Sequence, residues 1–237
     1  MTGKNVLKSN KFPVILPVFT KLKLINKAPR ISVPELYKLI KIDPVLTALT
    51  LNLYNKFYPK DSKKFQGIAK IIIVLNSNTV KNFLFDSVHS NDDENSKKQI
   101  DFWLRSAAGV AASNLLCEIR GIKSEKTEEY RAAALLRNFA DYPVACSFGF
   151  PESINDVILN YKSCADYSGG YKDLVSNTAL VDYIVDKYVF NKNKTKELDK
   201  NIFETLKVEK NILEKVKPEL IKGINTYTNF IDLKVSL

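Results

Sequence analysis

Apolar residues recur at helical spacing along the first third of the chain. Residues 13–27 place their apolar side chains on one face, which predicts a helix. Ser32 and Glu35 form a capping-box pattern and predict a short helix that follows. Asp43 and Pro44 then start another helix, because Asp caps free N–H groups and Pro fits the first helical position. This helix is predicted to run to about residue 58, and two short helices should follow at 65–75 and 79–87.

The second part of the chain begins after a polar segment. Residues 89–98 have no periodicity and are predicted to be a linker. Residues 99–120 form a long helical pattern whose middle, 107–113, has only small side chains and Val110, so neighbouring helices should approach it closely. Further helices are expected at 128–141, 152–161, 172–190 and within 196–237. The predicted fold is all-α, with two packed helical subdomains at residues 1–88 and 99–237.

Composition supports helices and narrows the setting. The 237 residues include only 8 Gly and 9 Pro, too few for a fold rich in strands and turns. The cysteines Cys117, Cys146 and Cys164 are far apart, which argues against a disulfide framework. No signal peptide is recognised, and the longest apolar run, residues 71–75, is too short to cross a bilayer. The sequence therefore predicts a soluble cytoplasmic protein without a membrane partner.

The net charge of +10 is unevenly distributed. Residues 1–85 hold 15 Lys or Arg against 3 Asp or Glu, whereas the remaining residues are close to neutral. Such asymmetry is found on surfaces that bind phosphates or nucleic acid. A chain rich in Lys, Asn and Ile also carries Lys on any solvated face, and Arg, the better phosphate ligand, occurs only once there, as Arg30. This second interpretation is favoured, so nucleic acid is not the expected partner.

The residue types that common active sites need are missing. His89 is the only histidine, which excludes metal sites built on several His, and the cysteines lack ligand spacing. Neither of the common glycine-rich phosphate loops, GxxxxGK[ST] and GxGxxG, occurs. We therefore predict no catalytic residues, no bound metal, no cofactor and no enzymatic activity.

One polar cluster is the natural candidate site. A small and apolar helix, residues 132–136, leads directly into Arg137, Asn138 and Asp141. A polar cluster at the end of a buried helix can be a site, a relic of one, or ordinary ion pairing. The residues alone leave these three alternatives open.

Four segments in order resemble the bacterial HDOD domain family. Residues 42–52, IDPVLTALTLN, with Asn55 and Tyr58, resemble its Asp-Pro signature, in which we place Asp43, Pro44, Asn52 and Asn55. Residues 68–82 resemble its next pair of helices. Phe102, Trp103 and the small-sided helix that follows resemble a third segment, and residues 133–139 resemble a fourth. The resemblance covers about residues 13–145 and is thin beyond them.

The family is related to HD-type metal phosphohydrolases and has lost catalytic residues to varying degrees. The resemblance places Arg105 where the ancestral motif has its first His, and Arg137 and Asn138 where it has the His-Asp pair. Asp182 would be a remnant of the last metal-binding Asp. Two cations in place of neutral ligands would repel a divalent metal, so the resemblance implies a degenerate HD-like bundle without phosphodiesterase activity.

Two interpretations of this degenerate site remain. If Arg105 and Arg137 face each other, their guanidinium groups could bind a phosphate or a nucleotide, with Asn138, Asp141 and Asp182 nearby. Alternatively they pair with Asp141, Asp182 or a helix carboxyl end and fill the space of a lost metal. The second interpretation is favoured.

Three function hypotheses follow. The first, implied by the resemblance, is a non-enzymatic signalling or regulatory module whose partner is most often another protein. The second is a residual nucleotide phosphohydrolase, which the missing ligands disfavour. The third is a binder of nucleic acid or a cyclic dinucleotide through the basic amino-terminal part, whose affinity would fall steeply with salt.

Overall fold

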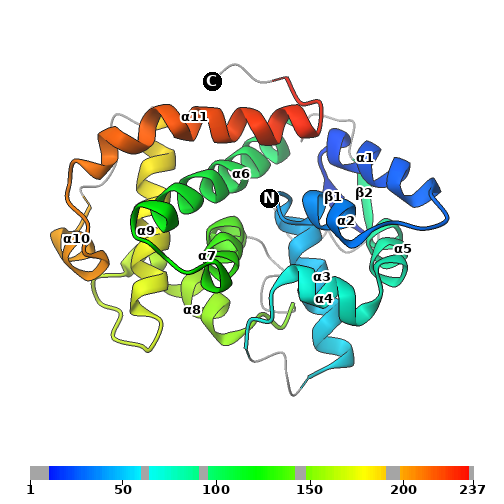
Figure 1. The fold of residues 1–237 in the computed structure, drawn as a ribbon, viewed down its shortest axis with the longest axis horizontal. Helices are drawn as coiled ribbons and strands as arrows, with labels where there is room; N and C mark the ends of the chain where they lie inside the picture. Colours follow the sequence, from blue (N-terminus) through cyan, green and yellow to red (C-terminus); the bar gives the residue numbers. More distant parts are fainter. Residues whose placement is uncertain (1–10, 60–63, 91–95, 142–147, 191–197, 235–237) are drawn as a thin grey trace.

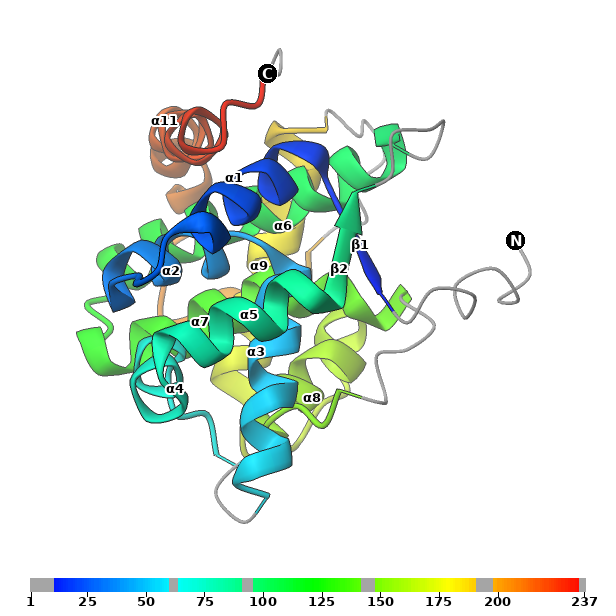
Figure 2. The same ribbon diagram turned by 90° about the vertical axis from the view of Figure 1, so that its right-hand side faces the viewer.

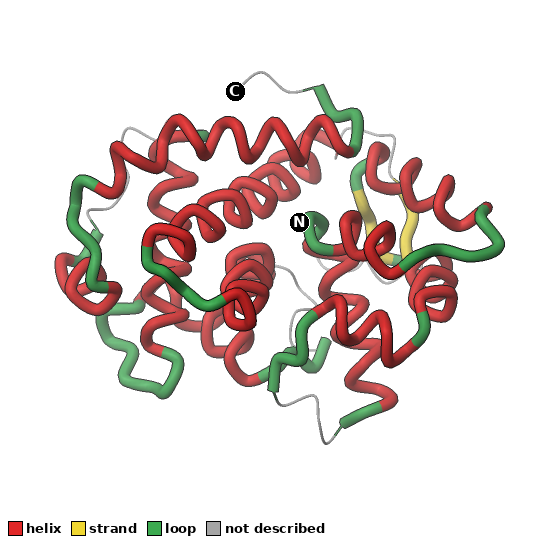
Figure 3. The backbone as a smooth tube through the Cα atoms, in the orientation of Figure 1, coloured by secondary structure: helices red, strands yellow, loops and turns green. Residues whose placement is uncertain are grey.

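The computed structural model describes residues 11–59, 64–90, 96–141, 148–190 and 198–234, and it is built almost entirely of helices (Figures 1 and 3). The amino-terminal helices lie on one side of the molecule and the carboxy-terminal helices on the other (Figure 1). The all-α fold class is confirmed. The division of the chain into two subdomains at residues 89–98 stays a prediction. One continuous set of packed residues extends through both parts.

The amino-terminal helices begin where the local signals place them. They are α1 (Leu16–Lys27), α2 (Val33–Ile40), α3 (Pro44–Phe57), α4 (Ile68–Leu75) and α5 (Ser77–Ser87). The capping box of α2 is complete, since Ser32 and Glu35 each accept a hydrogen bond from the other's backbone. Asp43 caps α3 through a 2.8 Å hydrogen bond from the backbone N–H of Leu46. Most of α3 is buried, so this helix is a core element of the amino-terminal part.

Two short strands were not predicted. β1 (Phe12–Val14) and β2 (Val88–Ser90) pair in parallel, with Phe12 opposite Val88 (Figure 2). The prediction of a helix over 13–27 is therefore wrong at its first residues, and the predicted linker of 89–98 begins inside a strand. Three-residue strands are too short to show a period of two, and their pairing depends on contacts far apart in sequence.

The carboxy-terminal part is arranged around the long helix α6 (Ser96–Ile119) (Figure 1). α6 packs against α7 (Ser124–Leu136), α9 (Lys172–Tyr188) and α11 (Ile212–Phe230). A short 3₁₀ helix, η1 (Arg137–Asp141), continues α7. The remaining elements are α8 (Glu152–Asn160), η3 (Tyr161–Ser163) and α10 (Lys200–Leu206). The small side chains at 107–112 are buried, in agreement with the predicted central position of this helix.

Within the described residues, no single helix has the length and apolar character needed to cross a membrane. The pair α4 and α5 meets the requirement only when the two are taken together, and they are bent by 103° relative to each other. Several of their apolar residues, including Ile71, Ile72 and Leu84, are buried inside the protein.

Candidate functional site

The candidate site lies where α6, α7 and α9 meet. Gly109 on α6 faces Arg137 at the end of α7, and a Cβ on Gly109 would lie 2.1 Å from Arg137 Nη1. The absence of a side chain at position 109 therefore leaves the volume that the guanidinium occupies. The surrounding alanines of α6 and α7 are buried and keep the two helices close together.

Arg137 is fully enclosed by protein. Its side chain has 0% exposure, and its guanidinium donates three hydrogen bonds. Nε donates to Asp182 Oδ1 at 2.9 Å, Nη1 to the carbonyl of Ala134 at 2.6 Å, and Nη2 to the carbonyl of Arg105 at 3.0 Å. A buried charge is tolerated only when it is paired and hydrogen-bonded, and Arg137 satisfies both conditions. The ion pair with Asp182 and the bond to the carboxyl end of α7 match the favoured interpretation from the sequence.

Arg105 directs its side chain elsewhere. Nη1 lies 2.5 Å from Asp186 Oδ1, and the guanidinium carbon lies 3.8 Å from the centre of the Phe190 ring. Such a position combines an ion pair with a cation–π contact. Each guanidinium group therefore pairs with its own carboxylate on α9, and the backbone carbonyl of Arg105 accepts a hydrogen bond from Arg137. Whether any ligand binds here stays a prediction.

Asn138 and Asp141 are the other two polar residues of the cluster. Asn138 lies in η1, and its Nδ2 is buried without a protein partner. Asp141 ends η1, but its side chain is outside the described residues, so its predicted role is not tested. On α6, Trp103 Nε1 and Ser106 Oγ are likewise buried without a protein partner. Buried polar atoms of this kind normally bond to an ordered water or a ligand.

The family-signature residues on α3 have structural roles. Asp43 and Pro44 start the helix. Asn52 Nδ2 donates to the carbonyl of Phe148 at 3.1 Å, which fastens α3 to the segment before α8. Asn55 packs against Gly149, where a Cβ would lie 2.0 Å from Asn55 Nδ2. The two asparagines therefore contact the segment that precedes α8.

Aromatic residues connect the two parts of the chain. Trp103 is only 1% exposed, and the ring of Phe139 lies within 6 Å of those of Phe102, Phe148 and Phe150. Phe12 of β1 joins this group at 5.2 Å from Phe148. Aromatic pairs at such distances stabilise a core. These side chains form a packed seam between the amino-terminal and carboxy-terminal helices.

The described residues contain no group of three or more His, Cys, Asp and Glu side chains that could hold a metal ion. Asp182 and Asp186, one helical turn apart on α9, each pair with an arginine instead. His89 lies in β2, which precedes α6 in the chain. The remnant metal-binding Asp suggested by the resemblance thus serves as the counter-ion of Arg137.

The sequence interpretation missed Gly109, Asp186 and Phe190. A signal existed for Asp186, because residues four apart on a helix share a face and Asp182 was already a candidate. Gly109 was noted only as part of a small-sided stretch. Its specific function, making room for Arg137, depends on a helix pairing that the local pattern does not encode.

Part of the positive charge of the amino-terminal region is used structurally. Lys81 is only 4% exposed, and its Nζ donates to the carbonyl of Ala28 at 2.8 Å, at the carboxyl end of α1. Lys21 pairs with Asp232 beyond the end of α11 at 3.2 Å. These two cations hold elements together and so contribute less to a surface for nucleic acid.

The HDOD domain family model matches residues 12–163, which is more than half of the chain. The chain belongs to the HDOD domain family. The matched region includes Arg105, Gly109, Arg137 and Asn138, whereas Asp182 and Asp186 lie beyond it. The candidate site of this HDOD protein therefore includes residues of a helix outside the family-matched region.

A solved structure supports the fold over the whole chain. It is the crystal structure of a protein of Marinobacter aquaeolei VT8 described as a candidate signal transduction protein, with a TM-score of 0.51 and 11% sequence identity. The alignment covers 98% of this chain but 62% of that one, so this HDOD chain spans less than two thirds of its structural relative. No curated protein matches the chain.

Proposed function

We propose that this HDOD chain is a non-enzymatic signalling or regulatory module that acts by binding another protein. The observation that carries the proposal is the enclosure of Arg137. This side chain stands where the resemblance places the His of a metal-binding pair, and it fills that position with a hydrogen-bonded cation. Family membership and the signal transduction description of the structural relative agree with a role in signalling.

The chemistry of the site argues against phosphohydrolase activity. Metal-dependent hydrolysis needs neutral or anionic ligands around a divalent ion that activates water. Here Asp182 is committed to Arg137 at 2.9 Å, and Asp186 to Arg105 at 2.5 Å. A metal at this place would have to displace two arginines from their counter-ions, and each guanidinium would repel it.

The surface carries exposed apolar side chains that could contact another protein. Large apolar side chains are exposed on the amino-terminal helices, among them Phe57 at 61% on α3 and Ile73 at 65% on α4, and these two helices pack together. Cores of protein interfaces are built mostly from aromatic and aliphatic side chains that are exposed in the free partner. We therefore expect the partner to cover this part of the molecule.

The enzymatic part of the proposal is tested on the purified full chain. Its metal content is measured by mass spectrometry after expression with added manganese and zinc. Hydrolysis of bis(p-nitrophenyl) phosphate is then measured with and without Mn²⁺. We expect substoichiometric metal and no hydrolysis above background. Stoichiometric metal accompanied by turnover that Asp182→Asn abolishes would overturn the proposal.

The binding part is tested by co-purification from a native lysate. The wild-type chain is compared with a Phe57→Ser/Ile73→Ser double variant, and Leu159→Ser on α8, which removes a side chain 72% exposed, is the matched control. We expect a defined protein to be retained by the wild type and the control and lost from the double variant. Equal retention by all three chains would place the contact elsewhere.

A further inference from the structure

A cavity lies at the carboxyl end of α6, away from the site at Arg137. Its volume is about 560 Å³, within the range of small-molecule sites. Arg120 lines this cavity. Arg105 lies 15 residues earlier in the chain, which corresponds to roughly 22 Å along the axis of α6. The other walls come from α9, α10, α11 and the α10–α11 connection, so this cavity is separate from the site at Arg137.

Charge in this cavity is unevenly compensated. Arg120 is 7% exposed in its side chain, and its Nη2 lies 2.5 Å from Asp173 Oδ1. Its Nε and Nη1 donate to the carbonyl of Leu206 and to Asn177 Oδ1. Lys207 and Lys215 also line the cavity, and within the described part of the chain neither forms an ion pair. The lining also holds Glu209, whose carboxylate accepts a hydrogen bond from Asn211, so the three cations of the cavity exceed its two carboxylates by one.

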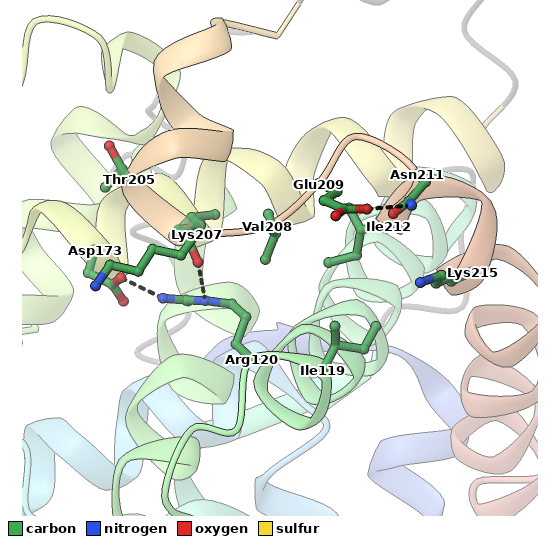
Figure 4. A pocket seen from close by; sticks show the side chains of 11 residues that line it. Ile119, Arg120, Asp173, Thr205, Lys207, Val208, Glu209, Asn211, Ile212 and Lys215 are labelled. Carbon is green, nitrogen blue, oxygen red and sulfur yellow. Dashed lines mark hydrogen bonds and ion pairs between the residues drawn. The ribbon is translucent and has the colours of Figure 1, made fainter.

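The wall between the two lysines is largely apolar but includes one carboxylate. Figure 4 shows Lys207 at one end and Lys215 at the other, with Ile119, Val208, Glu209 and Ile212 between them. Ile119 is 48% exposed although it is a large apolar residue. A ligand that covers this wall and meets both ammonium groups must be elongated, apolar in its middle and acidic at its ends.

The backbone conformation of Lys207 also singles out this cavity. Lys207 has φ +54°, in the left-handed region, and ends α10 where glycine is the usual residue. A residue with a side chain is strained in this conformation. Lys207 lines the cavity, and strained residues of this kind cluster at ligand sites.

We propose that this cavity binds an elongated organic anion with an apolar body and a carboxylate or phosphate at each end, held between Lys207 and Lys215. The bound ligand would join α6, inside the family-matched region, to α10 and α11 outside it. It would therefore couple the HDOD domain to the carboxy-terminal helices, independently of the protein contact proposed above.

Calorimetric titration of the full chain with matched probes tests this proposal. The probes are octanedioate and the bisphosphate of 1,6-hexanediol, which have two acidic ends, octanoate, which has one, and 1,8-octanediol, which has none. We expect at least one of the two dianions to bind about fivefold more tightly than octanoate, and the diol not to bind, because a second ion pair with an exposed lysine adds up to about that much affinity. Comparison of the two dianions distinguishes a carboxylate ligand from a phosphate ligand.

Three variants locate the binding. Lys207→Gly removes the ammonium group while relieving the left-handed strain, so it should fold at least as stably as the wild type. Lys215→Met removes the second ammonium group, and Lys210→Met, in the same connection but outside the cavity lining, is the control. We expect the first two variants to weaken dianion binding about fivefold and the control to bind like the wild type. The proposal is overturned if neither dianion binds, if the diol binds as tightly, or if the first two variants bind as the wild type does.

Discussion

The guanidinium group of Arg137 occupies the space that a side chain at Gly109 would need. A Cβ on Gly109 would lie 2.1 Å from Arg137 Nη1 and 2.9 Å from the carbonyl oxygen of Ala134. Glycine inside a helix ordinarily costs about 1 kcal/mol relative to alanine. Here the glycine is required, because the buried guanidinium has no other place to lie.

Gly109→Ala should therefore destabilise the protein, in the opposite direction to helix propensity. We expect the free energy of unfolding to fall by about 1–3 kcal/mol, the usual cost of overpacking a core. Urea denaturation followed by circular dichroism measures this change. In an Arg137→Met background, Gly109→Ala should cost less stability than it does in the wild type, because no guanidinium group then competes for the space beside position 109. Additive effects of the two substitutions would contradict the shared volume.

Asp182→Asn should be more costly than Asp186→Asn. The first leaves the fully buried charge of Arg137 without a counter-ion, and such losses cost about 3–5 kcal/mol. The second leaves Arg105, whose side chain is 24% exposed and also packs on Phe190, so about 1 kcal/mol is expected. Thermal and urea unfolding of the two variants give the comparison.

Replacing both partners of the buried pair separates charge from packing. Arg137→Met with Asp182→Leu removes the guanidinium and its counter-ion together, so no buried charge remains unpaired. This double variant should be more stable than Asp182→Asn alone, because apolar replacements of buried ion pairs are often neutral or stabilising. If the double variant is less stable than the single one, the loss in Asp182→Asn does not come from an unpaired charge.

Local signals in the sequence were sufficient for most of the fold. The capping box at Ser32 and Glu35 and the Asp43–Pro44 start each depend on residues within one helical turn, and the structure confirms both. β1 and β2 could not be found in this way. Phe12 pairs with Val88, far along the chain, and three residues give no measurable period.

The candidate site was predictable in its position but not in its contacts. The family resemblance placed Arg105, Arg137 and Asp182 close to one another, and hydrogen bonds from the Arg137 guanidinium reach both of the others. The direction of each side chain depends on how α9 is rotated against α6. In the observed orientation Asp182 pairs with Arg137 and Asp186 pairs with Arg105, and no local pattern of charges specifies this orientation.

Lys81→Met should loosen the end of α1. The Nζ of Lys81 is buried against the carbonyl of Ala28, and removing this donor leaves a carbonyl without its charged partner. We expect a loss of about 1–3 kcal/mol in the free energy of unfolding. Lys70→Met is the matched control, because Lys70 is exposed on α4 and bonds only to Gln66 at the surface, so its loss should stay within about 0.5 kcal/mol. Equal effects would mean that the contact with Ala28 adds no stability.

The pH dependence of stability should contain a contribution from Asp43. Burial raises the pKa of Asp43 to about 7, although hydrogen bonds from the backbone N–H groups of Leu46 and Val45 oppose the shift. The carboxyl group therefore binds its proton more tightly in the folded chain than in the unfolded chain. Its contribution to stability is fully present below about pH 4 and is lost as the pH rises through about 7. The span of this shift corresponds to a few kcal/mol at most.

Asp43→Asn isolates this contribution, because asparagine caps a helix about as well as aspartate but does not titrate. Urea denaturation of both chains between about pH 5 and pH 8 should show the wild type losing stability relative to the variant as the pH rises. Above about pH 8 the difference between the two chains should become constant, since the carboxyl group is then ionised in both states. Parallel pH profiles would mean that Asp43 titrates in the folded chain at its ordinary pKa. In that case the N–H groups at the start of α3 would outweigh the cost of burying the charge.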